Sequence, residues 1–296
     1  MSSSFLTPLP DRGIIEINGP DAAKFLQGLI TNDIDKTRPG AALFAGLLTP
    51  KGKIVSDFLI FMAETGRYWI DCPRDHVSDL IKRFSLYKLR AKLEITNLSD
   101  EFSVGAGWDE EPSRALEGFV AAYTDPRYAP IGQRFIVKAG AAQSAAPAPS
   151  ILGDPAYHSH RISAAIPQGG LDYVYGEGFP HEACYDDLHG VDFRKGCYVG
   201  QEVVSRMHHK GTAKTRIAAV SSSAALEGGG AEIYAAGQPV GRLGSVDGTR
   251  GIATIRLDRV QDALDRNIPL TVGRATLTLE QPPWASYMIP SEGVSP

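Results

Sequence analysis

Cysteine is scarce in this chain of 296 residues, which contains only Cys72, Cys184 and Cys197. Three widely spaced cysteines without a Cys-x-x-Cys pair exclude a disulfide framework and a cysteine-based zinc or redox motif. The sequence also lacks any run approaching the roughly 20 apolar residues of a membrane span, and it begins without the features of a secretory signal. We therefore expect a cytoplasmic protein with no membrane partner.

Neither sign of charge is in large excess, since 30 Lys and Arg face 34 Asp and Glu, for a net charge of −4. Hydrophobic residues make up 43% of the chain. This composition excludes a disordered or fibrous protein and gives no sign of a nucleic-acid binder. A basic cluster lies between residues 82 and 92, where a helix leads into a strand. Such a cluster is more often a solvated helix face than a binding site, so we expect no direct nucleic-acid partner.

Metal-binding and phosphate-binding motifs are absent as well. His208 and His209 are adjacent rather than spaced as helical ligands, and no other histidine or cysteine spacing matches a metal motif. The glycine run at 228–230 lacks the Gly-Lys-Ser/Thr ending of a phosphate loop. We expect no bound metal.

The first half of the chain mixes strand and helix patterns. Strands are predicted at 14–17, 43–48, 54–62, 67–70 and 92–96, and helices at 22–30, 74–87 and 155–166. The three strands from 43 to 70, separated by turn signals, predict an antiparallel meander. Because helices and strands do not alternate strictly, an α+β architecture is favoured over a doubly wound sheet. The Ala-, Pro- and Ser-rich segment 139–150 predicts a mobile loop.

The end of the chain has a different pattern. Short alternating segments at 215–220, 231–234, 239–245, 251–257 and 275–279 are separated by glycine turns. This arrangement predicts a small separate β-barrel or sandwich beyond residue 214.

The candidate reactive group is Cys197, in the run KGCYVGQE at residues 195–202. Gly196 and Gly200 permit a positive φ and leave the sulfur uncrowded, and Lys195 supplies positive charge that favours the thiolate. An incidental buried cysteine in a tight turn is the alternative. The remaining motif residues are an aromatic, an amide and a carboxylate: Tyr198, Gln201 and Glu202.

A second candidate is Asp57, a carboxylate inside the apolar strand 54–62. If its side chain points inward, it requires a protein or ligand partner, whereas an outward-facing carboxylate would be solvated. Arg161 and Glu182 lie in the region that leads to the cysteine motif, and each of them can line a pocket or a solvated surface.

These motifs, taken in order, resemble a known family. The segments 25–33, 50–54, 89–95, 125–127 and 195–202 are similar to those of the YgfZ-type folate-binding proteins, relatives of the glycine-cleavage T-protein that support iron-sulfur cluster assembly. The resemblance implies interleaved α+β units around a central opening for tetrahydrofolate over residues 1–213, followed by a β-barrel over 214–296. It also implies that Asp57 faces the folate, that Phe44 and Phe61 lie near aromatic pocket positions, and that Glu182 contributes to the same site. We expect Arg161 to line this folate site as well.

Two departures from the T-protein bear on activity. Ser56 stands where the T-protein has a first aspartate, and residues 125–127 replace a segment that the T-protein uses for folate. We therefore expect a tetrahydrofolate-binding accessory factor whose partners are iron-sulfur assembly proteins or cluster-containing client enzymes, with Cys197 as the working thiol. Two alternatives remain. One is a folate-dependent aminomethyltransferase or other one-carbon transferase, and the other is a folate-regulated module that binds an RNA-modifying enzyme through the 82–92 cluster.

Overall fold

The computed structural model describes residues 5–108, 119–140, 150–151, 153–211 and 213–290, so most of the predicted mobile loop lies outside the described residues. The chain forms two compact units. Unit 1 consists of residues 1–50, 55–158 and 188–201, and unit 2 of residues 51–54, 159–187 and 202–296. The boundary predicted at residue 213 falls inside unit 2, because residues 159–187 pack with the barrel.

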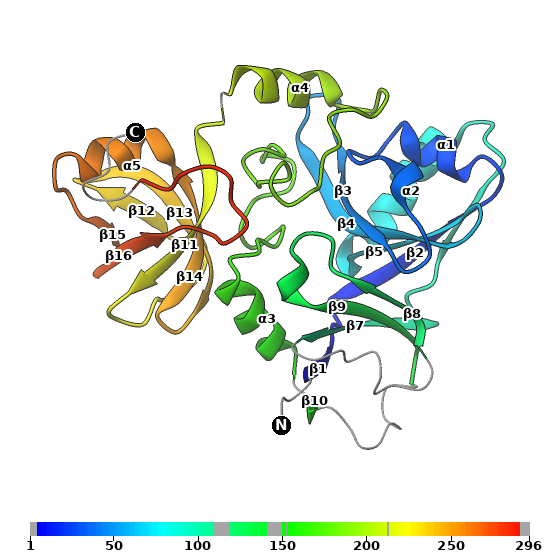
Figure 1. The fold of residues 1–296 in the computed structure, drawn as a ribbon, viewed down its shortest axis with the longest axis horizontal. Coiled ribbons are helices and arrows are strands. Elements are labelled where there is room, and N and C mark those ends of the chain that lie inside the picture. The colour runs from blue at the N-terminus through cyan, green and yellow to red at the C-terminus, as the bar shows by residue number, and fades with distance from the viewer. Residues whose placement is uncertain (1–4, 109–118, 141–149, 152, 212, 291–296) are drawn as a thin grey trace. The chain divides into compact units, whose positions relative to one another are not determined.

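Unit 1 contains a five-stranded sheet in the order β3-β4-β5-β2-β6 (Figure 1). Its strands are β2 (Arg12–Asn18), β3 (Ala42–Leu48), β4 (Ile54–Glu64), β5 (Arg67–Pro73) and β6 (Glu94–Asn97). The pairs β4–β5, β5–β2 and β2–β6 are antiparallel. The predicted meander is confirmed, and β2 adds the N-terminal strand beside it.

Helices cover one face of this sheet. The helices α1 (Ala22–Gln27) and α2 (Val77–Lys88) pack through Leu26, Leu80 and Phe84 onto a core that includes Phe58 and Ile60. Because successive strand residues alternate between faces, Asp57, Leu59 and Phe61 point to the opposite face. Helix α1 is shorter than predicted, because it ends at Gln27 with Gly28 as its C-cap.

A second five-stranded sheet covers that opposite face, in the order β10-β1-β7-β9-β8. Its strands are β1 (Phe5–Pro8), β7 (Phe102–Trp108), β8 (Phe119–Thr124), β9 (Gln133–Lys138) and β10 (Ser150–Ile151). Aromatic rings join the two sheets, with centroids 5.0 Å apart for Phe61 and Tyr123 and 4.8 Å apart for Trp69 and Phe102. Asp57 therefore lies on a face enclosed between two sheets.

Unit 2 contains a closed barrel in the order β11-β14-β13-β12-β15-β16, as predicted (Figure 1). Its strands are β11 (Thr215–Ser222), β12 (Glu232–Ala235), β13 (Gln238–Asp247), β14 (Arg250–Arg256), β15 (Leu270–Val272) and β16 (Ala275–Glu280). Helix α5 (Leu257–Leu264) adds Val260 and Ala263 to the barrel core. The helices α3 (Asp154–Ser163) and α4 (Gln201–Lys210) each contain one of the points where the chain passes between units. Among the residues described, no helix combines the length and apolar character needed to span a bilayer.

Candidate functional site

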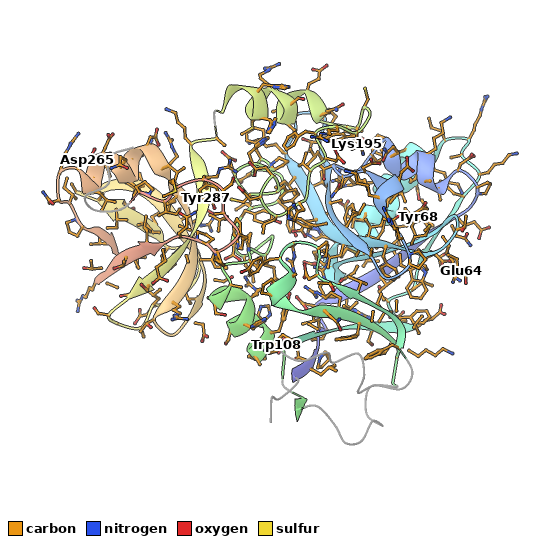
Figure 2. All side chains as sticks on the ribbon, in the orientation of Figure 1. Glu64, Tyr68, Trp108, Lys195, Asp265 and Tyr287 are labelled. Atoms are coloured by element: carbon orange, nitrogen blue, oxygen red, sulfur yellow. The ribbon has the colours of Figure 1, made fainter. Side chains whose placement is uncertain are left out.

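The segment that carries Cys197 is fastened to unit 1 by a buried lysine. The Lys195 ammonium donates to the carbonyl oxygens of Gln27, Ile30 and Asn32 at 2.8, 2.6 and 2.8 Å. We call residues 188–201 the cysteine segment and residues 27–37 the anchor loop; Lys195, labelled in Figure 2, joins the two. Burial lowers the pKa of Lys195 to about 8, against the opposing charges of nearby aspartates.

Two polar side chains of the anchor loop reinforce this connection. The Thr31 hydroxyl donates to the Gly190 carbonyl at 2.6 Å. The Asn32 amide donates to the carbonyls of His189 and Phe44 at 2.7 and 2.8 Å. Two sequence motifs that lie far apart along the chain, at 25–33 and 195–202, are therefore parts of one structural element.

Asp192 fixes the turn that precedes the motif. Its carboxylate accepts the Arg194 main-chain N–H at 2.7 Å and forms an ion pair with Lys36 of the anchor loop. Although burial alone would raise it, Lys36 and the Arg194 N–H hold the pKa of Asp192 below its usual value. The main chain on the N-terminal side of Lys195 is thus held by both charge and hydrogen bonds.

All three cysteines lie in the described residues, and Cys197 is the exposed one. Burial raises the pKa of Cys72 and of Cys184 to about 12, so both thiols stay protonated and unreactive. The predicted uncrowded sulfur agrees with this exposure. Gly200 has the expected positive φ of 84°, whereas Gly196 is not among the residues with positive φ, so that part of the prediction is wrong.

The other motif residues have distinct positions. Tyr198 is buried beneath Lys195, whose ammonium lies 4.9 Å from the ring centroid, and burial raises the pKa of Tyr198. Gln201 and Glu202 begin helix α4, a helix that sequence patterns did not predict. Because the three ammonium donors of Lys195 point to carbonyls, its effect on Cys197 is restricted to its charge.

The second candidate region lies between the two sheets of unit 1, where Asp57 is buried. Next to it, Arg12 donates to the Asp71 carboxylate at 2.6 Å, and the Tyr123 hydroxyl donates to the same carboxylate at 3.2 Å. Although burial alone would lower it, the charges of Asp71 and Asp57 raise the pKa of Arg12. Asp57 therefore has the inward orientation, in which a carboxylate needs a charged or ligand partner. The positive charge of Arg12 is one such partner.

A neighbouring ion cluster comes from the 125–127 motif. Arg127 pairs with Asp125 at 2.7 Å and lies 5.8 Å from the Phe44 ring centroid. Arg134 donates to the Tyr157 hydroxyl at 2.6 Å and completes the cluster. Burial alone would lower the pKa of Arg127. The negative charge of Asp125 raises it above its usual value, and the charge of Asp57 adds to this effect.

The structure thus gathers Asp57, Phe44 and Phe61, predicted from sequence, with residues that sequence reasoning missed: Arg12, Asp71, Tyr123, Arg134 and Tyr157. Polar residues inside otherwise apolar strands were the available signal for Asp71 and Arg134. A buried carboxylate beside arginines and aromatic rings can accept hydrogen bonds from the N–H groups of a flat heterocycle.

Arg161 and Glu182 belong to unit 2 and have partners there. Arg161 is fully buried and donates to the Asp172 carboxylate at 2.9 Å and to the Ser245 hydroxyl at 2.6 Å. Glu182 accepts the Phe179 main-chain N–H at 3.0 Å. It also lines a cavity of about 390 Å³ beside the barrel. These contacts fasten helix α3 and the 172–182 region to the barrel.

Comparison with known proteins identifies both parts of the chain. Residues 11–106 match the GCVT N-terminal domain, and residues 214–287 match the CAF17 C-terminal beta-barrel domain. The iron-sulfur cluster assembly factor IBA57 of Mus musculus, a mitochondrial protein, is 30% identical, with 86% of this chain and 78% of the mouse protein aligned. The chain belongs to the IBA57 family.

Other IBA57 proteins and one solved structure extend this result. The homologue from Mycosarcoma maydis is 33% identical over 73% of this chain, and the chain spans 57% of that protein and 52% of the Neurospora crassa homologue. The crystal structure of the glycine cleavage system aminomethyltransferase T from Bartonella henselae has a TM-score of 0.76, with 96% of this chain and 87% of that chain covered at 13% identity. The fold is therefore that of the T-protein, with a C-terminal barrel.

These relatives refine one expectation, the family, and correct another, the location. The relatives carry the IBA57 name rather than that of the related YgfZ proteins. Their names also describe mitochondrial proteins, which overturns the cytoplasmic location expected from cysteine usage and the first residues. Both reducing compartments tolerate free thiols, so cysteine content could not distinguish them.

Proposed function

We propose that this IBA57-family protein is an accessory factor in iron-sulfur cluster assembly or repair, that it binds tetrahydrofolate, and that Cys197 is its working thiol. The observation that carries the proposal is an exposed cysteine on a segment fixed by a buried lysine, in a chain whose relatives are named iron-sulfur cluster assembly factors. Iron-sulfur assembly proteins or client enzymes are the corresponding partners.

A single thiol suits a transient role toward the cluster. Stable clusters normally take four protein ligands. The described residues contain no group of three or more His, Cys, Asp or Glu side chains suited to a metal ion. Cys197 can therefore supply one ligand while a cluster is passed between other proteins, with the cluster as cargo rather than as a resident cofactor.

The folate part of the proposal is supported by the chemistry around Asp57. A buried carboxylate accepts hydrogen bonds from ring N–H groups, and nearby aromatic rings such as Phe44 and Phe61 provide apolar contact for a flat heterocycle. The charges of Arg12 and Arg127 interact with that carboxylate. When bound, tetrahydrofolate would act as a one-carbon carrier or as a ligand that stabilises the folded state. The residues around Asp57 would bind and orient it.

The alternative is a folate-dependent aminomethyltransferase, which is favoured by the T-protein fold and by the inward orientation of Asp57. Ser56, where the T-protein has an aspartate, lies on the opposite face of the strand, with its hydroxyl 2.9 Å from His76 Nδ1. Replacing Ser56 therefore alters the face of β4 that the helices cover, and leaves the face that carries Asp57 unchanged.

Complementation of a strain that lacks the gene tests the proposal, with the activity of cluster-containing enzymes as readout. We expect wild type and Cys184→Ser to restore activity and Cys197→Ala to fail, with Cys197→Ala retaining the wild-type melting temperature. Asp57→Asn is expected to lose binding of tetrahydrofolate in a calorimetric titration, whereas the matched control Ser56→Ala retains it. Full rescue by Cys197→Ala together with failure of Asp57→Asn would favour the transferase.

A further inference from the structure

The C-terminal end of helix α2 exposes three large apolar side chains in four consecutive residues. Leu86, Tyr87 and Leu89 are 76%, 41% and 88% exposed. The buried face of the helix is formed by other residues, among them Leu80 and Phe84, so the exposed side chains contribute nothing to the core. We call residues 86–89 the knuckle. An apolar group of this size at the surface is a common sign of an interaction site.

The backbone holds the end of the knuckle outward in an unfavourable conformation. Leu89 is the C-cap of the helix and has φ 45° and ψ −108°, a combination that L-residues with a Cβ atom rarely adopt. Glycine would occupy this corner without strain. A leucine that is strained and 88% exposed stabilises nothing within unit 1, and such a residue points to a role outside the fold.

Positive charge surrounds the knuckle. Lys82, Lys88, Arg90 and Lys92 form no ion pair with any residue that the structure describes. Arg83, in contrast, pairs with Asp79 one helical turn earlier. The chain as a whole has a net charge of −4, so this local excess of cations opposes the overall charge. An apolar centre with a charged rim is the usual anatomy of a protein interface.

We propose that the knuckle docks an acidic partner protein, which receives Leu86 and Leu89 in an apolar recess and pairs Asp or Glu side chains with the surrounding cations. Charge complementarity selects an acidic occupant. A protein is favoured over an anionic bilayer because the carboxylate of Glu94 is exposed within the cationic cluster and would repel an extended anionic surface, whereas a protein can place its acidic side chains away from Glu94. The inference is independent of the proposed function, since it uses neither Cys197 nor Asp57.

Photo-crosslinking of the full chain tests the inference. Ser85, an exposed residue next to the knuckle, is replaced by p-benzoylphenylalanine, and crosslinked peptides from a lysate of the source cells are identified by mass spectrometry. The identified protein is then purified and titrated against four variants. Leu86→Ser/Leu89→Ser removes the apolar part, and Met288→Ser, at a residue 75% exposed in unit 2, is its control. Lys88→Glu/Arg90→Glu reverses two charges, and Arg274→Glu, an exposed residue of unit 2, is the control.

We expect one protein to crosslink through a segment that contains Asp or Glu. Both knuckle variants should weaken its binding about tenfold or more, the controls should remain near wild type, and added salt should weaken binding further. None of the four variants changes a buried side chain, so melting temperatures should stay close to wild type. A crosslink to a second copy of this chain, a crosslinked segment without acidic residues, binding unchanged in either knuckle variant, or retention only on phosphatidylglycerol vesicles would each overturn the proposal.

Discussion

Lys195→Met tests whether the lysine beside Cys197 acts first as an anchor. The variant leaves three carbonyls without their donor, of which those of Ile30 and Asn32 are in buried hydrogen bonds. A buried acceptor without a partner costs about 1–3 kcal/mol, so these two cost about 2–6 kcal/mol. Removing an ammonium whose charge is opposed by burial returns part of that cost. We therefore expect the free energy of unfolding to fall by about 2–4 kcal/mol.

Urea unfolding followed by tryptophan fluorescence measures this loss, with Lys36→Met as the matched control from the anchor loop. The Lys36 side chain is 57% exposed, and its ion pair with Asp192 is expected to contribute about 1 kcal/mol or less. Alkylation of Cys197 across pH reports separately on the charge effect that the sequence predicts for Lys195. If Lys195→Met is no less stable than Lys36→Met, the reasoning from the two buried hydrogen bonds is refuted.

Three further outcomes are expected. Burial would raise the pKa of Asp125, but its two arginine partners lower it from 3.8 to about 2. The stabilisation from this carboxylate is therefore present above pH 4 and lost as pH falls to 2. Asp125→Asn should lower the free energy of unfolding by about 2 kcal/mol at pH 7 and make it depend less on pH between 4 and 2. In the native protein, iodoacetamide should modify Cys197 and leave the two buried cysteines intact until urea unfolds the chain, as peptide mass spectrometry would show; equal rates for all three would contradict the burial argument. Arg161→Met should lower stability by about 3–5 kcal/mol because it leaves Asp172 buried without its cation, and an unchanged melting temperature would exclude this account.

The sequence predicted those parts of the fold in which local patterns are strong. The strand at β4 within the predicted meander and the glycine-separated strands of the barrel were both confirmed. The second sheet of unit 1 was missed because it joins strands that are distant in the chain, such as β1 and β7, whose residues Leu6 and Gly107 are partners. No window of local sequence contains that pairing.

In the candidate site, too, the sequence predicted what depends on neighbouring residues and missed what depends on distant ones. Cys197 could be found from its neighbours alone, and its exposure agrees with the prediction. The partners of Lys195 could not be found, because they are main-chain carbonyls, which leave no trace in residue type, at positions about 165 residues earlier. Likewise, Asp57 was recognised as unusual within a strand, but Arg12 became relevant only once β2 and β4 were known to share a sheet.

The connection between the anchor loop and the cysteine segment also constrains the order of folding. Lys195 and Gln27 are 168 positions apart, so their hydrogen bond closes a long loop whose entropic cost must be met by contacts formed elsewhere. During synthesis, the anchor loop is complete long before the residues that secure it exist. The cysteine therefore acquires its surroundings only at a late stage, and a partly folded chain would contain the thiol without the frame that presents it.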